Sequence, residues 1–417
     1  MKKYNLIVIG GGFSGVTAAV SAARNGLDVL LVEKNGVLGG AMTNNLVYPF
    51  AGYWTRIPET NEKKQLNSGI FEDIRKLQLK YCGNDKNSFF NPEYYKFILD
   101  ELVTDANVDI LFHSTLFDIQ KDGKFIKSVS LATPSGVLTV ESDFFCDASG
   151  NGDLFAFAGC DYQLGRESDS LCQPMTTCFR LCNVDTELFK KESDMVNQKY
   201  SELQQAGEIT NPRENILVFY GIGDGIIHLN TTRVVKHNPV DVFDLSKAEI
   251  TARRQVYEMD SFLKKHSKAF KNSEIVSVSN EIGVRESRKL KGCYILTDRD
   301  LIDMVDFEDT IALGNYSIDI HNPEGGGTIM HDFKAGEYYK IPYRSLLPKE
   351  YENLVVAGRC ISATHEAQSA IRVIPICASL GEAAGTAVAV AHATGKTAHT
   401  LDVKLLREKL LANGAAI

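Results

Sequence analysis

The stretch YNLIVIGGGFSGVTAAVSAARNGLDVLLVEK, Tyr4 to Lys34, decides the fold. Tyr4–Ile9 is a short apolar run, which is typical of a strand buried on both faces of a parallel sheet. A helix is predicted over Phe13–Asn25, ended by Gly26, and a second strand over Val29–Val32. Strand, glycine turn, helix and strand in this order predict the first unit of a Rossmann-like α/β domain.

The turn of this unit carries the motif GxGxxG at Gly10, Gly12 and Gly15. The first glycine permits a tight turn, the second lets the backbone approach a pyrophosphate, and the third lets the helix pack close to the strand. The helix then points its N-terminal N–H groups at the phosphates, and Glu33 can accept from the ribose hydroxyls. A carboxylate there would repel a 2′-phosphate, so NADP is not expected at this site. The frame around the motif indicates dinucleotide binding rather than a plain glycine turn.

A second glycine pair, Gly39-Gly40, follows Glu33 in EKNGVLGGAMT, where an NAD domain would normally enter its next helix. The segment resembles that of glutathione-reductase-like flavoproteins, in which it crosses the pyrophosphate toward the flavin. The likeness covers these two glycines and Ala41, Met42 and Thr43, and it favours FAD over NAD.

Residues 107–154 predict one parallel strand and then antiparallel strands, with turns at Asp122-Gly123 and Ser135-Gly136. The last strand ends at Asp147-Ala148-Ser149-Gly150, and such a turn can contact a ligand in an open α/β sheet. An ordinary loop would read the same way. The turn resembles the DATGDGD element of FAD-dependent oxidoreductases, with Ser149 for the usual Thr and Asn151 for the usual Asp, while Gly150, Gly152 and Asp153 match.

The C-terminal part predicts a late strand of the same sheet at Leu354–Ala357, which ends at Gly358. A helix of small residues follows, from Pro375 to the stop at Gly395. The helix is either an Ala-rich packing helix or one whose N-terminus meets the flavin ring, with the turn at Gly358 beside the ribityl chain. We therefore expect one FAD domain from residues 1–161 and 339–417 and an inserted α+β substrate domain over 162–338.

The segment VVAGRCISATHEAQSAIRVIPICASLGEAAGTAVAV is similar to the C-terminal signature of bacterial FAD-dependent oxidoreductases. These proteins are related to the flavin domain of heterodisulfide reductase and, more remotely, to the fumarate reductase flavoprotein. The likeness spans nearly the whole chain and implies non-covalent FAD, without naming a substrate. It adds further cofactor-binding residues: Phe13, Ser14, Lys34, Leu116, Ala148, Arg359, Gly381 and Ala384.

The best catalytic candidate lies in NYSIDIHNPEGGG. Read as a strand, it places Asp319 and His321 on one face and Tyr316 on the other. His321 would exchange the proton that accompanies hydride transfer, or it is a structural histidine bonded to Asp319. His365 is the competing acid–base residue.

Three arginines complete the expected site. The family likeness places Arg372 near the flavin. Arg285 and Arg288 would clamp a carboxylate, or form a solvated or ion-paired helix end. Tyr316 and Asp319 join these two as candidate substrate-binding residues.

Composition narrows the function classes. Charged residues make up 24% of the chain and the net charge is −8 with no Lys/Arg block, which disfavours nucleic acid and anionic membranes. No apolar run approaches the ~20 residues of a membrane span, and the nine cysteines show no zinc or iron–sulfur spacing. We expect a cytoplasmic protein with reduced thiols and no metal.

The leading hypothesis is an FAD-dependent oxidoreductase that moves a hydride between flavin N5 and a small polar metabolite, either neutral or anionic. The alternatives are a flavin monooxygenase, a non-catalytic FAD-binding scaffold and an electron-transfer subunit. The sequence has no second GxGxxG motif between a predicted strand and a predicted helix, so it predicts no separate NAD domain. NAD(P)H and a separate electron-transfer protein both stay open as redox partners, as does a homodimer.

Overall fold

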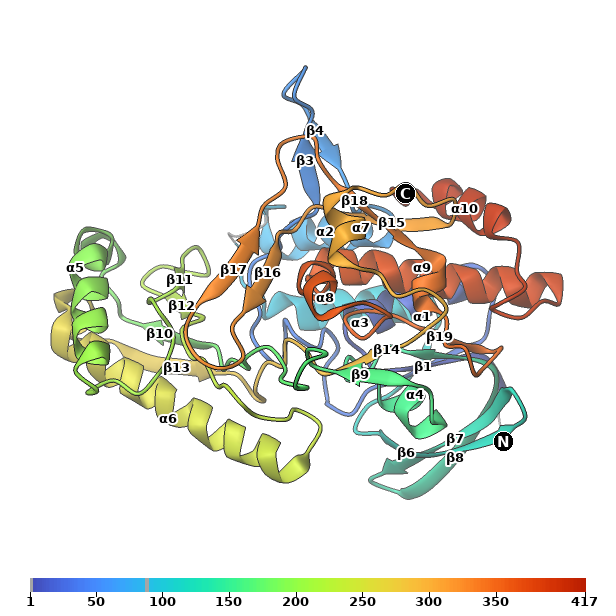
Figure 1. Cartoon of the computed structure of the whole chain (residues 1–417), viewed down its shortest axis with the longest axis horizontal. Coiled ribbons are helices and arrows are strands. Elements are labelled where there is room, and N and C mark those ends of the chain that lie inside the picture. The colour runs from blue at the N-terminus through green and yellow to red at the C-terminus, as the bar shows by residue number, and fades with distance from the viewer. Residues whose placement is uncertain (1–2, 87–89) are drawn as a thin grey trace.

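The computed structural model describes residues 3–86 and 90–417. Its largest sheet has seven strands in the order β5-β2-β1-β8-β7-β6, with β19 paired to β8 (Figure 1). The strands are β1 Lys3–Ile9, β2 Val29–Val32, β5 Asp109–Leu111, β6 Thr115–Asp122, β7 Phe125–Thr133, β8 Gly136–Asp147 and β19 Leu354–Val356. The Rossmann-like α/β fold predicted from the sequence is confirmed.

Strand β8 joins the two kinds of pairing within this sheet. Its first half pairs antiparallel with β7, and its second half pairs parallel with β1 and β19. The carboxyl ends of β1, β8 and β19 therefore meet at one edge, where an α/β sheet places its ligands. The late strand predicted near the C-terminus is in this position, so the two ends of the chain build one sheet.

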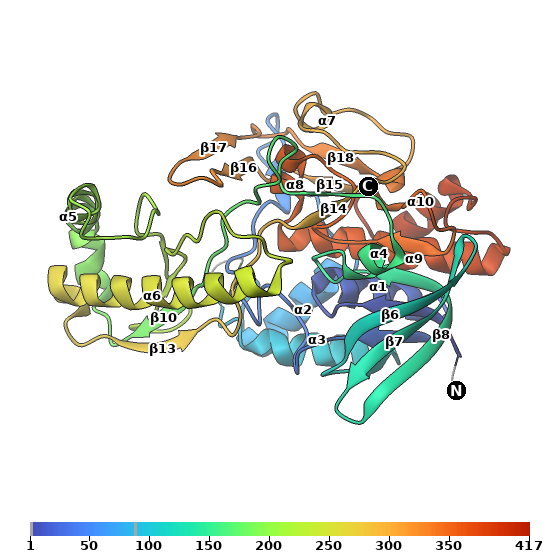
Figure 2. The same cartoon turned by 60° about the horizontal axis from the view of Figure 1, so that its bottom comes forward.

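Helices α1 (Phe13–Arg24) and α9 (Ile374–Thr394) cross the middle of the molecule together (Figures 1 and 2). A Cβ on Gly381 would overlap the carbonyl oxygen of Ser14, and a Cβ on Gly385 would overlap that of Ala18. Thr17 also donates from Oγ1 to Ala378 O at 2.7 Å. The small residues of α9 therefore serve close helix packing.

Helix α9 also corrects the expectation about apolar runs. The helix has 21 residues, and its most apolar stretch of 18 residues has a mean hydropathy of 1.5, enough by length and composition to span a membrane. Yet 94% of that stretch is buried inside the protein. Counting consecutive apolar residues overlooks it because Ser379, Glu382 and Thr386 interrupt the run. Its apolar character is explained by packing in the core.

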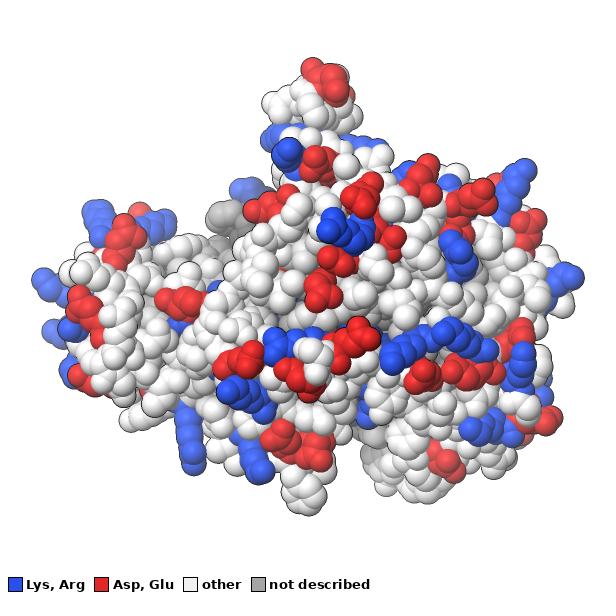
Figure 3. All heavy atoms as spheres, viewed as in Figure 1, with Lys and Arg blue, Asp and Glu red and all other residues white. Residues whose placement is uncertain are grey.

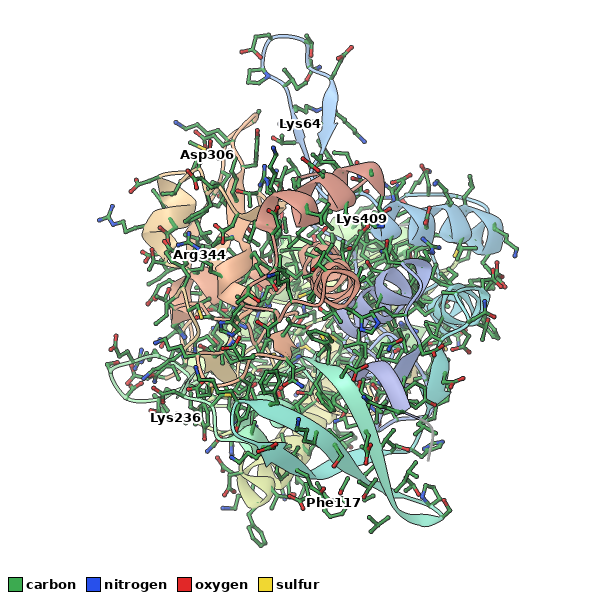
Figure 4. The ribbon with its side chains drawn as sticks, turned by 90° about the vertical axis from the view of Figure 1, so that its right-hand side faces the viewer. Lys64, Phe117, Lys236, Asp306, Arg344 and Lys409 are labelled. Atoms are coloured by element: carbon green, nitrogen blue, oxygen red, sulfur yellow. The ribbon has the colours of Figure 1, made fainter. Side chains whose placement is uncertain are left out.

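The remaining elements of the larger lobe surround this centre. A hairpin of β3 (Trp54–Arg56) and β4 (Lys63–Gln65) projects from it, and Figure 4 shows Lys64 on the hairpin. The helices are α2 Ile70–Cys82, α3 Tyr94–Asp105, α4 Asp153–Ala158, α7 Asp298–Ile302, η2 Tyr343–Leu346, α8 His365–Ile371 and α10 Val403–Ala412. The strands are β3 Trp54–Arg56, β4 Lys63–Gln65, β9 Tyr162–Leu164, β14 Arg288–Leu290, β15 Thr310–Gly314, β16 Ile318–His321, β17 Thr328–His331 and β18 Tyr339–Pro342.

A smaller lobe, which we call the cap, extends to one side in Figures 1 and 2. Its four-stranded antiparallel sheet has the order β11-β12-β10-β13. Its elements are β10 Phe179–Cys182, α5 Thr186–Gln205, β11 Val218–Phe219, β12 Ile227–Leu229, α6 Val242–His266, η1 Lys268–Phe270 and β13 Glu274–Val278. The cap has a hydrophobic core of its own, formed by residues between Phe179 and Phe270.

The predicted division into domains over 162–338 stays a prediction, but the packing follows narrower limits. Leu290, Ile311 and Ile318 belong to the large core and not to the core of the cap. Strand β15 pairs with β18 across the predicted boundary at residue 338. The chain therefore returns to the large lobe well before that boundary.

Figure 3 shows one face of the molecule, on which acidic and basic side chains alternate. No large area of this face is uniformly basic. Mixed charge of this kind produces no strong attractive field for a polyanion.

Candidate functional site

The first cavity lies at the carboxyl end of β1, and its floor is the glycine turn. Gly10 has φ +102°, and a Cβ there would overlap Ala148 O. A Cβ on Gly15 would overlap Gly10 O, whereas a Cβ on Gly12 meets nothing within 4 Å. Gly10 thus forms a tight turn and Gly15 allows close packing of the helix, whereas open space lies next to Gly12, where the approach of a pyrophosphate stays a prediction.

Glu33 is buried at the end of β2 and lines the first cavity. Its Oε2 accepts from Gly11 N at 2.7 Å, and its Oε1 accepts from Asn35 N at 2.8 Å. Burial raises the pKa of this carboxyl, while the two backbone bonds oppose the rise. Each oxygen keeps a further lone pair, so the carboxylate can fix the glycine turn and still accept from a ribose hydroxyl.

The turn after β8 is held by Asp147, which is fully buried. Its Oδ1 accepts from Ser149 Oγ at 2.7 Å, and its Oδ2 accepts from Phe155 N at 2.9 Å. Burial raises the pKa of Asp147 to about 6 despite these bonds. Arg359 donates from Nε to Gly150 O at 2.9 Å and so ties this turn to the one after β19.

Most predicted cofactor residues line the first cavity. They are Gly10, Gly12, Phe13, Ser14, Glu33, Lys34, Gly39, Gly40, Ala41, Ala148, Ser149, Gly150, Gly358 and Arg359. Their convergence follows from the sheet, which brings the ends of β1, β2, β8 and β19 to one edge.

Seven predicted cofactor residues do not line the first cavity, and their contact with the cofactor stays a prediction. They are Gly15, Met42, Thr43, Leu116, Asp153, Gly381 and Ala384. Gly15 and Gly381 lie in the contact between α1 and its neighbours, and Thr43 donates to Leu38 O at 2.6 Å within its loop. Sequence position alone does not separate a residue that contacts a ligand from one that supports the contacting loop.

The cap closes one side of the first cavity, which the sequence did not predict. Lys34 Nζ lies 2.9 Å from Glu281 Oε2, and Asn45 Nδ2 donates to Glu281 O at 2.9 Å. Glu249 of α6 accepts from Ile282 N at 2.7 Å and also lines the cavity. No motif marks these residues, because the contact depends on how the cap docks.

A second cavity of about 670 Å³ adjoins the first, within the size range of small-molecule sites. The residues that line both cavities are Ala41, Asn45, Val284, Arg359, Arg372 and Ile374. Ile374 begins α9, so the N-terminus of this helix lies at the junction, and its contact with the flavin ring stays a prediction.

Asp319 is the central carboxylate of the second cavity. Tyr316 Oη donates to its Oδ2 at 3.0 Å, and His321 Nε2 and Arg372 Nη2 lie 3.4 and 3.5 Å from the same oxygen. Burial opposes ionisation, but His321, Arg372 and Arg285 together lower the pKa of Asp319. Strand β16 places Asp319 and His321 together as predicted, whereas Tyr316 precedes the strand and turns toward them.

His321 is held as a neutral imidazole. Arg233 Nη2 lies 3.0 Å from its Nδ1, and a guanidinium can only donate, so Nδ1 accepts and Nε2 carries the proton. Burial and the charge of Arg285 lower the pKa of His321 to about 3, against the opposing effect of Asp319. Its Nε2–H points to Asp319 over a long distance and keeps donor capacity toward a ligand.

Two candidates lie outside both cavities. His365 Nδ1 lies 2.8 Å from Glu286 Oε2, in a buried cluster that also contains Lys289. Arg288 pairs with Asp153 at 3.1 Å and donates to Asn151 O. It is ion-paired, as one alternative had it, but it begins strand β14 and does not end a helix. Arg285 alone of the predicted pair lines the second cavity.

The fold and the glycine-lined cavity are those of a dinucleotide-binding protein, and comparison with known proteins shows its family. The family described as FAD dependent oxidoreductase matches residues 5–410. The chain belongs to this family; it is an oxidoreductase, and its cofactor is FAD.

Individual relatives match only parts of the chain. A thioredoxin reductase of Bacillus subtilis (strain 168) is 32% identical over 98 residues, which is 23% of this chain and 29% of the relative. A digeranylgeranylglycerophospholipid reductase of Methanosarcina mazei is 29% identical over 146 residues, 34% of this chain and 32% of the relative. The chain thus aligns with about a third of each curated relative.

Solved structures with a similar course of the chain include a geranylgeranyl bacteriochlorophyll reductase-like protein from Thermoplasma acidophilum, at TM-score 0.49 and 13% identity over 99% of this chain and 83% of that one. The anhydrotetracycline hydroxylase OxyS from Streptomyces rimosus gives TM-score 0.49 and 11% identity over 99% and 66% of the two chains.

Proposed function

We propose that the chain transfers a hydride between flavin N5 of FAD, bound non-covalently in the first cavity, and a carbon of a small polar metabolite in the second. The observation that supports this proposal most directly is that the two cavities adjoin each other and share lining residues, among them Arg372 and Ile374. A cofactor and a substrate in such adjoining sites can come into direct contact.

The residues of the chain position the partners. Gly12 and the N-terminus of α1 would hold the pyrophosphate, and Glu33 a ribose. Bound FAD supplies the two-electron chemistry. His321, as a neutral donor, would hydrogen-bond a substrate oxygen through Nε2–H, while Arg233, which donates to Nδ1, fixes the orientation of the ring.

The electron balance defines the co-reactants. In the oxidising direction a substrate C–H bond breaks, its hydrogen leaves with both electrons to FAD, and a hydroxyl proton goes to solvent. The reducing direction reverses these changes. A nicotinamide nucleotide or a separate electron-transfer protein would then exchange electrons with the flavin.

An anaerobic spectroscopic titration tests the proposal. FAD-loaded protein is mixed with NADH, NADPH and panels of alcohols, and after dithionite reduction with unsaturated acids and ketones. Bleaching or recovery of the flavin band at a substrate-dependent rate is expected. Oxygen-dependent product hydroxylation as the only turnover would favour a monooxygenase, and no response to any small molecule would favour a scaffold or an electron-transfer subunit.

A further inference from the structure

The charges around the second cavity do not balance. Four guanidinium groups line it, those of Arg213, Arg285, Arg359 and Arg372, against the carboxylates of Glu214 and Asp319. Glu214 is shared with Arg233, whose Nη1 lies 2.8 Å away. The wall therefore carries more cations than anions.

Two of these guanidinium groups, those of Arg359 and Arg285, have no carboxylate partner among the described residues. Arg359 donates to Gly150 O at 2.9 Å and to Asn151 Oδ1 at 2.8 Å, both of which line the first cavity. Arg285 is the unpaired cation of the second cavity. Its Nη1 donates to Pro174 O at 2.6 Å and to Thr176 Oγ1, both uncharged, and it forms no ion pair within residues 3–86 and 90–417. Burial, together with the charges of Arg372 and Arg213, lowers the pKa of Arg285 to about 9. Arg285 is half-buried, and a partly desolvated cation without a counter-ion gains from an anion that binds beside it.

Arg372 lies beside this group at the junction of the two cavities. It precedes α9, its Nη2 reaches Asp319 only at 3.5 Å, and its buried Nε has no hydrogen-bond partner in the described structure. The N-terminus of α9 adds a partial positive charge at the same place. An anion held here would lie against the wall shared with the first cavity.

The rest of the second cavity is different in character. Its wall includes the apolar side chains of Val47, Tyr48, Leu217, Phe219 and Met330. A ligand that satisfies both regions has one anionic end and an apolar body.

We propose that the second cavity binds an organic carboxylic acid, with the carboxylate between Arg285 and Arg372 and the carbon body on the apolar wall. This inference rests on the proposed function for the reaction and adds the class of substrate. A guanidinium fork matches the geometry of a carboxylate. A single negative charge would pair with Arg285, which has no carboxylate partner, whereas Arg372 already lies 3.5 Å from Asp319.

Matched ligand pairs test the assignment by calorimetry at constant ionic strength: acetate with acetamide, benzoate with benzamide, and cinnamate with cinnamamide. Each acid should bind more tightly than its amide, and benzoate and cinnamate more tightly than acetate. Arg285→Gln should weaken carboxylate binding about 10- to 150-fold, the usual effect of one hydrogen bond to a charged group. Amide binding and FAD affinity should not change.

Two further variants make the result specific. Arg285→Lys keeps the charge without the fork and should lose part of the affinity, which also covers the case in which Arg285→Gln does not fold. Arg344→Gln removes an arginine at the outer surface, paired with Asp309 at 2.9 Å, and should bind carboxylates like the unchanged protein (Figure 4).

Acids that bind no more tightly than their amides would overturn the proposal, as would Arg285→Gln with unchanged carboxylate affinity. Phenyl phosphate that binds in an Arg285-dependent way and more tightly than benzoate would overturn it in favour of a phosphate site. Flavin turnover of neutral metabolites without carboxylate binding would refute this inference alone. Carboxylate binding to protein that exchanges no electrons would refute only the proposed function.

Discussion

Two alanine substitutions in one glycine motif should have opposite effects on folding and on cofactor binding. Gly12 has φ −67° and ψ 178°, which alanine adopts readily, and its added Cβ meets no protein atom within 4 Å. The gain from a less flexible unfolded chain and the loss of a favoured helix cap oppose each other, so apoprotein stability should change by less than about 1 kcal/mol. Gly15→Ala instead places Cβ against Gly10 O, and its apoprotein should be destabilised by at least about 1–3 kcal/mol.

Gly12→Ala should weaken FAD binding, although it leaves the stability of the apoprotein nearly unchanged. The methyl group would fill the space through which the backbone approaches the pyrophosphate, and an overpacking cost of about 1–3 kcal/mol corresponds to a Kd about 5- to 150-fold higher. Flavin fluorescence titration of the apoprotein measures Kd, and thermal melting without FAD measures stability. Gly325→Ala, which also has open space but lies outside both cavities, is the control.

Unchanged FAD affinity in Gly12→Ala would refute the placement of the pyrophosphate. Apoprotein of Gly15→Ala that melts like the unchanged protein would refute the close contact between α1 and the turn.

Three further results are expected. Burial raises the pKa of Glu382 from 4.5 to about 7, so the folded state binds its proton more tightly than the unfolded state does, and the free energy of unfolding falls as pH rises from about 4.5 to 7. Glu382→Gln should remove this loss, which is roughly 3 kcal/mol above pH 7. Thermal melting of both proteins at several pH values measures the difference. His321→Ala should keep FAD bound and lower turnover about 100-fold or more. Because burial and the charge of Arg285 lower the pKa of His321 to about 3, the turnover rate of the unchanged enzyme should show no ionisation of this residue between pH 5 and 8. A change of the rate with pH centred at about pH 6.5 that His321→Gln abolishes would contradict the neutral assignment. Gly381→Ala should lower the melting temperature of the apoprotein, because its Cβ overlaps Ser14 O, and an unchanged melt would show that α1 and α9 are not in close contact there.

Local motifs in the sequence were sufficient to predict the nucleotide-binding part of the molecule. Interactions between residues close together in the chain determine this part of the structure: the motif at Gly10, Gly12 and Gly15, the strand before it and Glu33 after it. The sequence pattern and the positions of these residues were therefore enough to predict it. The helix that ends at Gly395 was predicted within a residue at each end for the same reason. Asp319 and His321 shared a face because a strand alternates its side chains with a period of two.

The tertiary structure decided the substrate side. Arg285 and Arg288 are equivalent in the sequence, yet one lines the second cavity and the other pairs with Asp153, because docking of the cap and of β14 sets where each side chain points. His365 was the competing acid–base candidate, but it is buried beside Glu286 and lines neither cavity. Contacts such as Lys34 with Glu281 join residues far apart in the chain, and only the packed fold brings them together. The sequence alone determined the class of cofactor site, because it depends on local backbone geometry, whereas the unpaired charge of Arg285 exists only once the chain has folded around it.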